Sequence, residues 1–146
     1  MAKPTKADAD LLLRLYDIRR EPEMRKARHW FLHVFQPSDW EALKSQRMTG
    51  SDEDRYLRMV TSYWDMVSAF VKQGVLNEQI FFSTNGENVV VWNKVSPWIK
   101  ELRNEMKRPT YLKNLETVVE QHLEWRQKQT EKARKNQATN KGKKKG

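Results

Sequence analysis

The chain has 146 residues, no cysteine, and 28 lysine and arginine residues against 19 acidic residues, for a formal net charge of +9. A chain of this length can bury a hydrophobic core as one domain, and the lack of cysteine excludes disulfides, thiolate zinc sites and thiol catalysis. No stretch approaches the ~18 apolar residues of a membrane span, and the N-terminus lacks the apolar run of a secretory signal, so we expect a cytoplasmic protein without a membrane span.

The first two predicted helices follow a short flexible N-terminus, residues 1–7. Apolar residues at steps of three and four predict a helix that Asp8 or Asp10 can cap. Pro22 interrupts this helix, because the residue before a proline disfavours helical backbone while proline itself suits the first turn of a new helix. The second helix then continues until Pro37 ends it.

The middle of the chain predicts the helix around which the others pack. Ser38 and Glu41 have the spacing of a capping box and predict a short helix before the central one. Residues 51–73 then carry apolar side chains on most of the helix circumference and leave only a thin polar stripe. We therefore expect other helices to surround this central helix. Gly74 can adopt the left-handed conformation that ends a helix.

Shorter helices are predicted after the central one. Asn77 can start a brief helical turn, although residues 80–82 could also form a strand. Helical spacing favours a helix over residues 88–107, with a bend or restart at Pro97. Residues 89–92 have high β propensity, but a single short strand has no evident partner.

The last predicted helix begins at Thr110 and loses its apolar stripe after Trp125. We expect it to extend a few turns into solvent and to dissolve near Asn136, so that residues 126–146 form a basic helix extension and a disordered tail. Together these elements predict an all-α fold, a single-domain bundle of about six helices over residues 8–125 with a long C-terminal helix.

Three segments of the chain resemble a family of small helical bacterial and phage proteins known as a domain of unknown function. The segments run from Leu15 to Phe31, from Tyr63 to Phe82 and from Trp92 to Arg103. The resemblance implies a helical domain over most of residues 10–125 and carries over no catalytic residue. In many members of that family, a membrane-anchoring helix precedes a domain that resembles this one. We expect this chain to differ from them in lacking such a helix.

His29 and His33 lie four residues apart on a predicted helix, which is the spacing of a metal-binding pair. The glutamate of an HEXXH motif is missing between them, and only His122 remains as a third imidazole. We therefore interpret the pair as surface or packing histidines and expect no metal and no cofactor. Because no nucleophile with a base, paired carboxylates or glycine-rich phosphate loop is evident, we expect the protein not to be an enzyme.

Two groups of acidic residues have structural interpretations. Ser51 has the chemistry of a helix start, and the acidic residues 52–54 that follow it lie in the first turn of the central helix, where negative charge stabilises the positive end of the helix dipole. Asp65 is the lone acid on the polar stripe of the central helix, and we expect it to pair with a buried arginine such as Arg19 or Arg103.

The six tryptophans are many for a chain of this length. Most fall on predicted apolar faces and are interpreted as core residues. Trp40 and Trp125 are the candidates for surface anchors that bind a protein partner, since Trp125 lies where the last helix leaves the domain.

The positive charge is concentrated at the C-terminus, where Glu131 is the only acid after residue 125. Without interleaved aromatic residues, this segment is expected to bind nucleic acid independently of sequence, although it could also be a solubilising end or a remnant of a fusion. The candidate nucleic-acid-binding residues are Arg126, Lys128, Lys132, Arg134, Lys135, Lys141, Lys143, Lys144 and Lys145.

Two functional hypotheses follow. The first is a non-enzymatic helical protein-interaction module that binds a protein partner through its aromatic-rich bundle. The second is a nucleic-acid-associated accessory protein that binds non-specifically through its lysine-rich C-terminal tail. Partner identity and oligomeric state stay open at this point.

Overall fold

The computed structural model describes residues 2–146, and over that range the chain forms α-helices and one short 3-10 helix without a β-strand. The predicted all-α class is confirmed. The helices, in chain order, are α1 (Lys6–Arg20), α2 (Pro22–His33), α3 (Trp40–Gln46), α4 (Asp52–Lys72), α5 (Glu78–Thr84), α6 (Glu87–Val95), the 3-10 helix η1 (Ser96–Trp98), α7 (Ile99–Glu105) and α8 (Lys113–Lys144).

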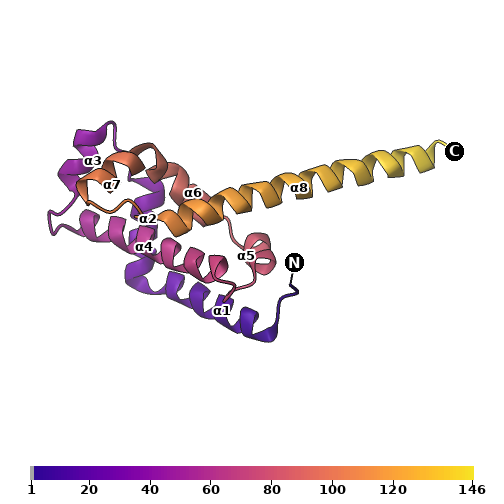
Figure 1. Cartoon of the computed structure of the whole chain (residues 1–146), viewed down its shortest axis with the longest axis horizontal. Helices are drawn as coiled ribbons and strands as arrows, with labels where there is room; N and C mark the ends of the chain where they lie inside the picture. Colours follow the sequence, from indigo (N-terminus) through magenta and orange to yellow (C-terminus); the bar gives the residue numbers. More distant parts are fainter. Residues whose placement is uncertain (1) are drawn as a thin grey trace.

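Helix α4 is the central element, as predicted. It packs against α2 and α8 and also contacts α5 and α6. Figure 1 shows α1 to α7 gathered at one end of the molecule with the first part of α8, whose remainder leads away to the C-terminus. Two polar residues inside the core, Thr61 and Ser68, donate hydrogen bonds to carbonyls one turn back, at 2.8 and 2.7 Å. The apolar residues of α4 that the core buries are Leu57, Val60, Tyr63, Trp64, Val67 and Val71.

The first helix begins earlier than predicted. Thr5, not Asp8 or Asp10, is its N-cap residue, and Asp8 completes a capping box by accepting the Thr5 amide at 2.7 Å. The other carboxylate oxygen of Asp8 accepts the Asn77 amide at 2.8 Å, and these backbone hydrogen bonds from Thr5 and Asn77 lower the pKa of Asp8. Part of the expected flexible N-terminus is therefore attached to the start of α5, while residue 1 lies outside the described range.

Local capping rules account for the next helix boundaries. Helix α2 begins at Pro22, as predicted, but it ends at His33, before Pro37. Helix α3 is capped by Asp39, one residue after the predicted Ser38, and the Asp39 carboxylate accepts the Ala42 amide at 2.8 Å.

The boundaries around α4 and α5 match the predictions. Ser51 caps α4, and Gly74 has a φ of 74°, the left-handed conformation expected after the helix. Asn77 caps α5 through the Ile80 amide at 3.0 Å. The alternative strand over residues 80–82 is wrong, because this segment lies inside α5.

The predicted helix over residues 88–107 is divided at Pro97. Helix α6 precedes the 3-10 turn and α7 follows it. The valines at 89–91 lie in α6 because Val89 and Val91 are buried among the other helices, and this packing outweighs their β propensity. Lys94 of α6 donates to the carbonyls of Phe31 and Phe35, both at 2.9 Å, and so joins α6 to the C-terminal end of α2.

The last helix, α8, begins at Lys113 instead of Thr110 because Leu112 adopts a φ of 56° and reverses the chain. Its first turn has no cap of its own. Asp65 of α4 supplies one: it accepts the Leu115 amide at 3.0 Å and the Asn114 side chain at 3.2 Å. The predicted pairing of Asp65 with an arginine is therefore wrong.

The arginines proposed as partners of Asp65 bind other carboxylates. Arg19 forms an ion pair with Glu87 at 2.6 Å, and Arg103 forms one with Glu116 at 2.7 Å. Each of these acids is close to its arginine in the fold but distant from it in the sequence. Helical spacing therefore could not indicate these pairs.

Helix α8 also ends later than predicted. It continues past Asn136 to Lys144, so that only the last two residues lie outside the helix. Lysine, arginine, glutamine and alanine have high helix propensity, and lysines in the last turn interact favourably with the negative end of the helix dipole. These local preferences extend the helix without any contact to the bundle.

Candidate functional site

The bundle holds only the first part of α8. Four residues of that helix are buried, namely Leu115, Val118, Val119 and His122. They pack between α4 and α6, the two helices that contact α8 most. One turn further along the helix, Trp125 is only half-buried and its neighbours are exposed, so His122 is the last fully buried residue of α8.

His122 forms a buried polar junction between three helices. Its Nε2 lies 3.1 Å from the carbonyl oxygen of Phe82 in α5, and its Nδ1 lies 3.2 Å from the side-chain nitrogen of Asn88 in α6. A carbonyl only accepts and an amide nitrogen only donates, so the ring is neutral with its proton on Nε2. Burial, together with the charge of Arg126, lowers the pKa of His122 to about 4.

Trp125 and Arg126 lie where α8 leaves the bundle. The ring of Trp125 is half-buried, with its centroid 6.0 Å from that of Phe82 and 6.2 Å from that of His122. A Cβ atom added to Gly86 would lie 3.0 Å from the Arg126 guanidinium, so this side chain rests close to the backbone between α5 and α6. The base of the projecting helix is therefore packed on two sides.

The two predicted protein anchors are both half-buried. Trp40 at the start of α3 packs against the core, as Trp125 does. Among the tryptophans, only Trp64 is almost fully buried, and the other predicted core tryptophans are partly exposed and pack against the core. The binding of a partner by Trp40 or Trp125 stays a prediction.

Beyond Trp125, every residue of α8 is exposed. We call residues 126–145 the basic arm. Its helical part, residues 126–144, is about 28 Å long at the usual rise of 1.5 Å per residue, and it projects from the bundle (Figure 1). The nine predicted nucleic-acid-binding residues all lie in this arm, and Glu131 is its only acid.

The cations of the basic arm are distributed around the helix, and none of them is neutralised by an ion pair within residues 2–146. At 100° per residue, successive basic residues point to several sides of the helix, and the only apolar residues are Ala133 and Ala138. Within residues 2–146, none of the ion pairs includes a cation of the arm. The arm therefore presents positive charge in all directions and offers no apolar stripe.

The three histidines do not come together. His29 and His33 are exposed on α2 with ring centroids 4.9 Å apart, whereas His122 is enclosed by α5, α6 and α8. In the described part of the chain, no group of three or more histidine, aspartate or glutamate side chains has the geometry to hold a metal ion.

The acidic cluster lies in the first turn of α4, where it was predicted to stabilise the helix. Asp54 is buried and accepts a hydrogen bond from the Gly50 amide at 3.3 Å. Asp52 pairs with Arg55 at 3.1 Å on the surface. These contacts account for two of the three acids in terms of local structure.

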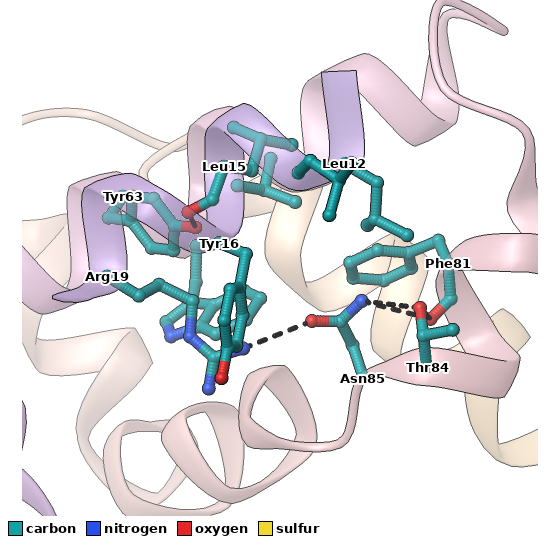
Figure 2. Close-up of a pocket in the computed structure, with 11 residues that line it drawn as sticks. Leu12, Leu15, Tyr16, Arg19, Tyr63, Phe81, Thr84 and Asn85 are labelled. Carbon is teal, nitrogen blue, oxygen red and sulfur yellow. Dashed lines mark hydrogen bonds between the residues drawn. The ribbon is translucent and has the colours of Figure 1, made fainter. Parts of the chain in front are cut away.

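A cavity that sequence reasoning missed lies between α1, α4 and α5, with a volume of about 290 Å³. Figure 2 shows Leu12 and Leu15 on one side of it, Phe81 on another, and Arg19 bonded to Asn85 at its polar end. The cavity requires three helices from distant parts of the chain. The one local signal was the position of Arg19 on the same helix face as Leu12 and Leu15.

Comparisons with known proteins identify one relationship. A family model described as "Domain of unknown function (DUF4760)" matches residues 4–126. No curated protein and no solved structure matches the chain. Within residues 2–146, no helix combines the length and the apolar character needed to cross a membrane.

Proposed function

Because the chain belongs to the DUF4760 family, and the segment that shows this covers the bundle but little of the basic arm, we propose that the bundle is a non-enzymatic module that presents the arm to nucleic acid. The arm binds the phosphate backbone independently of sequence. The cysteine-free composition suits a reducing compartment such as the cytoplasm, which we include in the proposal.

The observation that carries this proposal is the exposed, projecting basic arm, which has nine basic residues and one acid. Each phosphate that a lysine or arginine neutralises releases a condensed counterion, which makes association favourable at low salt. An α-helix is about 10–12 Å across, similar to the width of the DNA major groove, and 28 Å of helix passes roughly eight phosphates of one strand.

The same geometry argues against a protein partner for the arm. Helices that pair with other helices, or that bind in a protein groove, need apolar anchors at steps of three and four. The only apolar side chains of the arm are those of Ala133 and Ala138, which are small and do not have this spacing. Charge on all sides of the helix instead suits a polyanion, which requires no single docking face.

The proposal is tested with charge variants of the full chain. We expect the triple variant Lys128→Gln, Lys132→Gln and Lys135→Gln to bind a fluorescein-labelled DNA duplex more weakly than the parent protein. Fluorescence anisotropy at several salt concentrations between 50 and 200 mM measures the effect. Three lost phosphate contacts should reduce the slope of log K against log salt by about 2 to 3.

The matched control replaces three exposed lysines of the bundle, Lys44, Lys72 and Lys100, by glutamine. It changes the net charge by the same amount, and we expect it to retain nearly the parent salt slope. Equal losses in the two triple variants would show that binding follows total charge and not the arm. A parent protein that does not bind the duplex at 50 mM salt would refute the proposal outright.

A protein-interaction role for the bundle is the second candidate. The observation that favours it is a set of exposed apolar side chains on α1, where Leu13, Tyr16 and Ile18 are exposed by 62, 50 and 46%. In this case we expect a partner that co-purifies with the parent chain to be lost from a variant with Leu13→Ser and Ile18→Ser. The variant Met48→Ser, at an exposed site elsewhere, is the control and should retain it.

A further inference from the structure

We propose that the cavity between α1, α4 and α5 is a binding site for a medium-chain carboxylate, with the alkyl chain against the apolar walls and the carboxylate at Arg19. The site lies in the bundle and is independent of the basic arm. It therefore adds a small-molecule ligand to the proposed nucleic-acid function without depending on it.

The size and lining of the cavity define the ligand. Its volume is about 290 Å³, which is room for roughly ten heavy atoms when about 30 Å³ is allowed for each, the volume of one water molecule in the liquid. Its walls are mainly apolar side chains, including Leu12, Val67 and Phe81. An unbranched chain of about eight carbons ending in a compact polar group fits both properties.

The charge at the polar end selects an anion. Two arginines, Arg19 and Arg28, share one carboxylate, that of Glu87, at 2.6 and 3.0 Å. The side chain of Glu87 is only 8% exposed, so the three groups form a largely buried cluster with one uncompensated positive charge. Within residues 2–146, no acidic side chain lines the cavity itself. An anionic ligand would balance this cluster.

Arg19 has the hydrogen-bonding capacity to bind such an anion. Its guanidinium carries five N–H donors. Nη2 donates to Glu87, and Nη1 donates to the Asn85 side chain at a long 3.3 Å. Nε is buried and has no partner. Three donors are therefore unused, and a carboxylate is the planar acceptor that pairs best with a guanidinium.

A second unpaired donor belongs to the cavity wall. Trp64 is only 1% exposed, and its buried indole nitrogen has no hydrogen-bond partner. The Arg19 guanidinium lies 5.1 Å from the centroid of this ring. By contrast, the hydroxyl of Tyr63 already donates to the Leu15 carbonyl at 2.6 Å. Two residues that line the cavity, Arg19 and Trp64, thus each have a buried donor without a partner.

The proposal is tested by isothermal titration calorimetry of the full chain with sodium octanoate, which has an eight-carbon chain and a carboxylate. We expect binding at one site. Octan-1-ol has the same chain without the charge, and we expect it to bind at least about tenfold more weakly because a charge-assisted hydrogen bond contributes that much. Acetate, which lacks the chain, should not bind detectably.

Two pairs of variants locate the site. Thr84 lines the cavity and Ser83 does not, and both are exposed near the end of α5. We expect Thr84→Phe to abolish octanoate binding by filling the cavity, and Ser83→Phe to leave it unchanged. Similarly, Arg19→Gln should reduce octanoate affinity to that of octan-1-ol, while Arg14→Gln, an exposed arginine of the same helix, should have no effect.

Several results would overturn the proposal. These are a failure of octanoate to bind the parent chain, equal affinities for octanoate and octan-1-ol, or equal effects of the two phenylalanine variants. If Arg19→Gln does not fold because Glu87 loses a partner, the comparison of the two ligands on the parent chain still decides the role of the charge. None of these results depends on nucleic-acid binding, so the two proposals fail separately.

Discussion

The environment of His122 differs strongly from that of a free side chain in water. It is fully buried, neutral and bonded at both ring nitrogens, so that it connects α5, α6 and α8 where the basic arm begins. Its low pKa follows from this burial. A group that must stay neutral in the folded state makes stability depend on pH.

We expect the free energy of unfolding to fall as the pH is lowered from 6.5 toward 4. The unfolded chain binds a proton on His122 near pH 6.5, its ordinary pKa, whereas the folded chain does so only near pH 4. Between these values the unfolded state binds more protons, so stability that is present above pH 6.5 is lost on acidification. The loss amounts to at most about 3 kcal/mol and is measured by urea unfolding at several pH values.

Substitutions at two histidines isolate this effect. His122→Gln keeps a side-chain N–H for the Phe82 carbonyl but cannot titrate, so it should flatten the pH dependence between 6.5 and 4.5. His29→Gln alters an exposed histidine of α2 and should preserve it. A pH dependence that survives in His122→Gln would contradict this assignment.

Asp65 gives a second prediction for a single residue. It caps the first turn of α8 from a different helix, through the Leu115 amide and the Asn114 side chain. We expect Asp65→Ala to lower the free energy of unfolding by about 1 to 2 kcal/mol, the usual cost of losing an N-cap. Denaturant titration measures the change.

The control for this variant is Glu120→Ala, which removes an exposed carboxylate from α8 itself. It should change stability by less than about 0.5 kcal/mol. If the two substitutions have equal effects, Asp65 acts only through its charge and not as a cap.

Single residues were predictable where their partners are near in the sequence. Ser51 and Asn77 were identified as caps because each bonds an amide three residues ahead, which depends only on local chain geometry. Asp65, Glu87 and His122 bond to groups on other helices, and nothing in their spacing indicates which groups those are. Their partners required the tertiary structure.

At the scale of helices, the bundle and the arm have different sources of stability. Helix α4 is surrounded by others and derives its stability from buried apolar area, which periodicity in the sequence indicated. Beyond Arg126 every side chain of the arm is exposed, and the helix there relies on propensity and favourable charge at its C-terminal end. Sequence reasoning ended the helix near Asn136 because it gave too little weight to these local terms.

This difference gives a prediction for the arm as an element. We expect deletion of residues 127–146 to leave the thermal midpoint of the bundle almost unchanged, because no side chain in that segment is buried. The same deletion should reduce the helical circular dichroism signal at 222 nm by the share of the removed helix.

The contrary results are equally clear. A large fall in the thermal midpoint would mean that the arm contacts the bundle in solution. If the deletion does not reduce the total helical signal, the arm is not helical without a binding partner. Retention of Trp125 and Arg126 in the deletion variant keeps the packed base of α8 intact.

Over the whole molecule, charge and apolar surface are separated along one axis. The bundle is nearly neutral and contains the core, the Arg19–Glu87–Arg28 cluster and the cavity. The arm carries most of the net charge away from it (Figure 1). The count of charges along the sequence predicted this division, because charge position needs no knowledge of packing. The cavity could not be predicted, since it exists only where three helices meet.

The most direct test of the proposed nucleic-acid role maps the contact surface on the intact chain. Amide chemical shifts of ¹⁵N-labelled protein are measured by NMR during titration with an unlabelled DNA duplex at low salt. We predict that the shifts are confined to residues 126–145 and reverse when salt is added. Shifts that lie instead on the bundle, or no shifts at a saturating duplex concentration, would contradict the account.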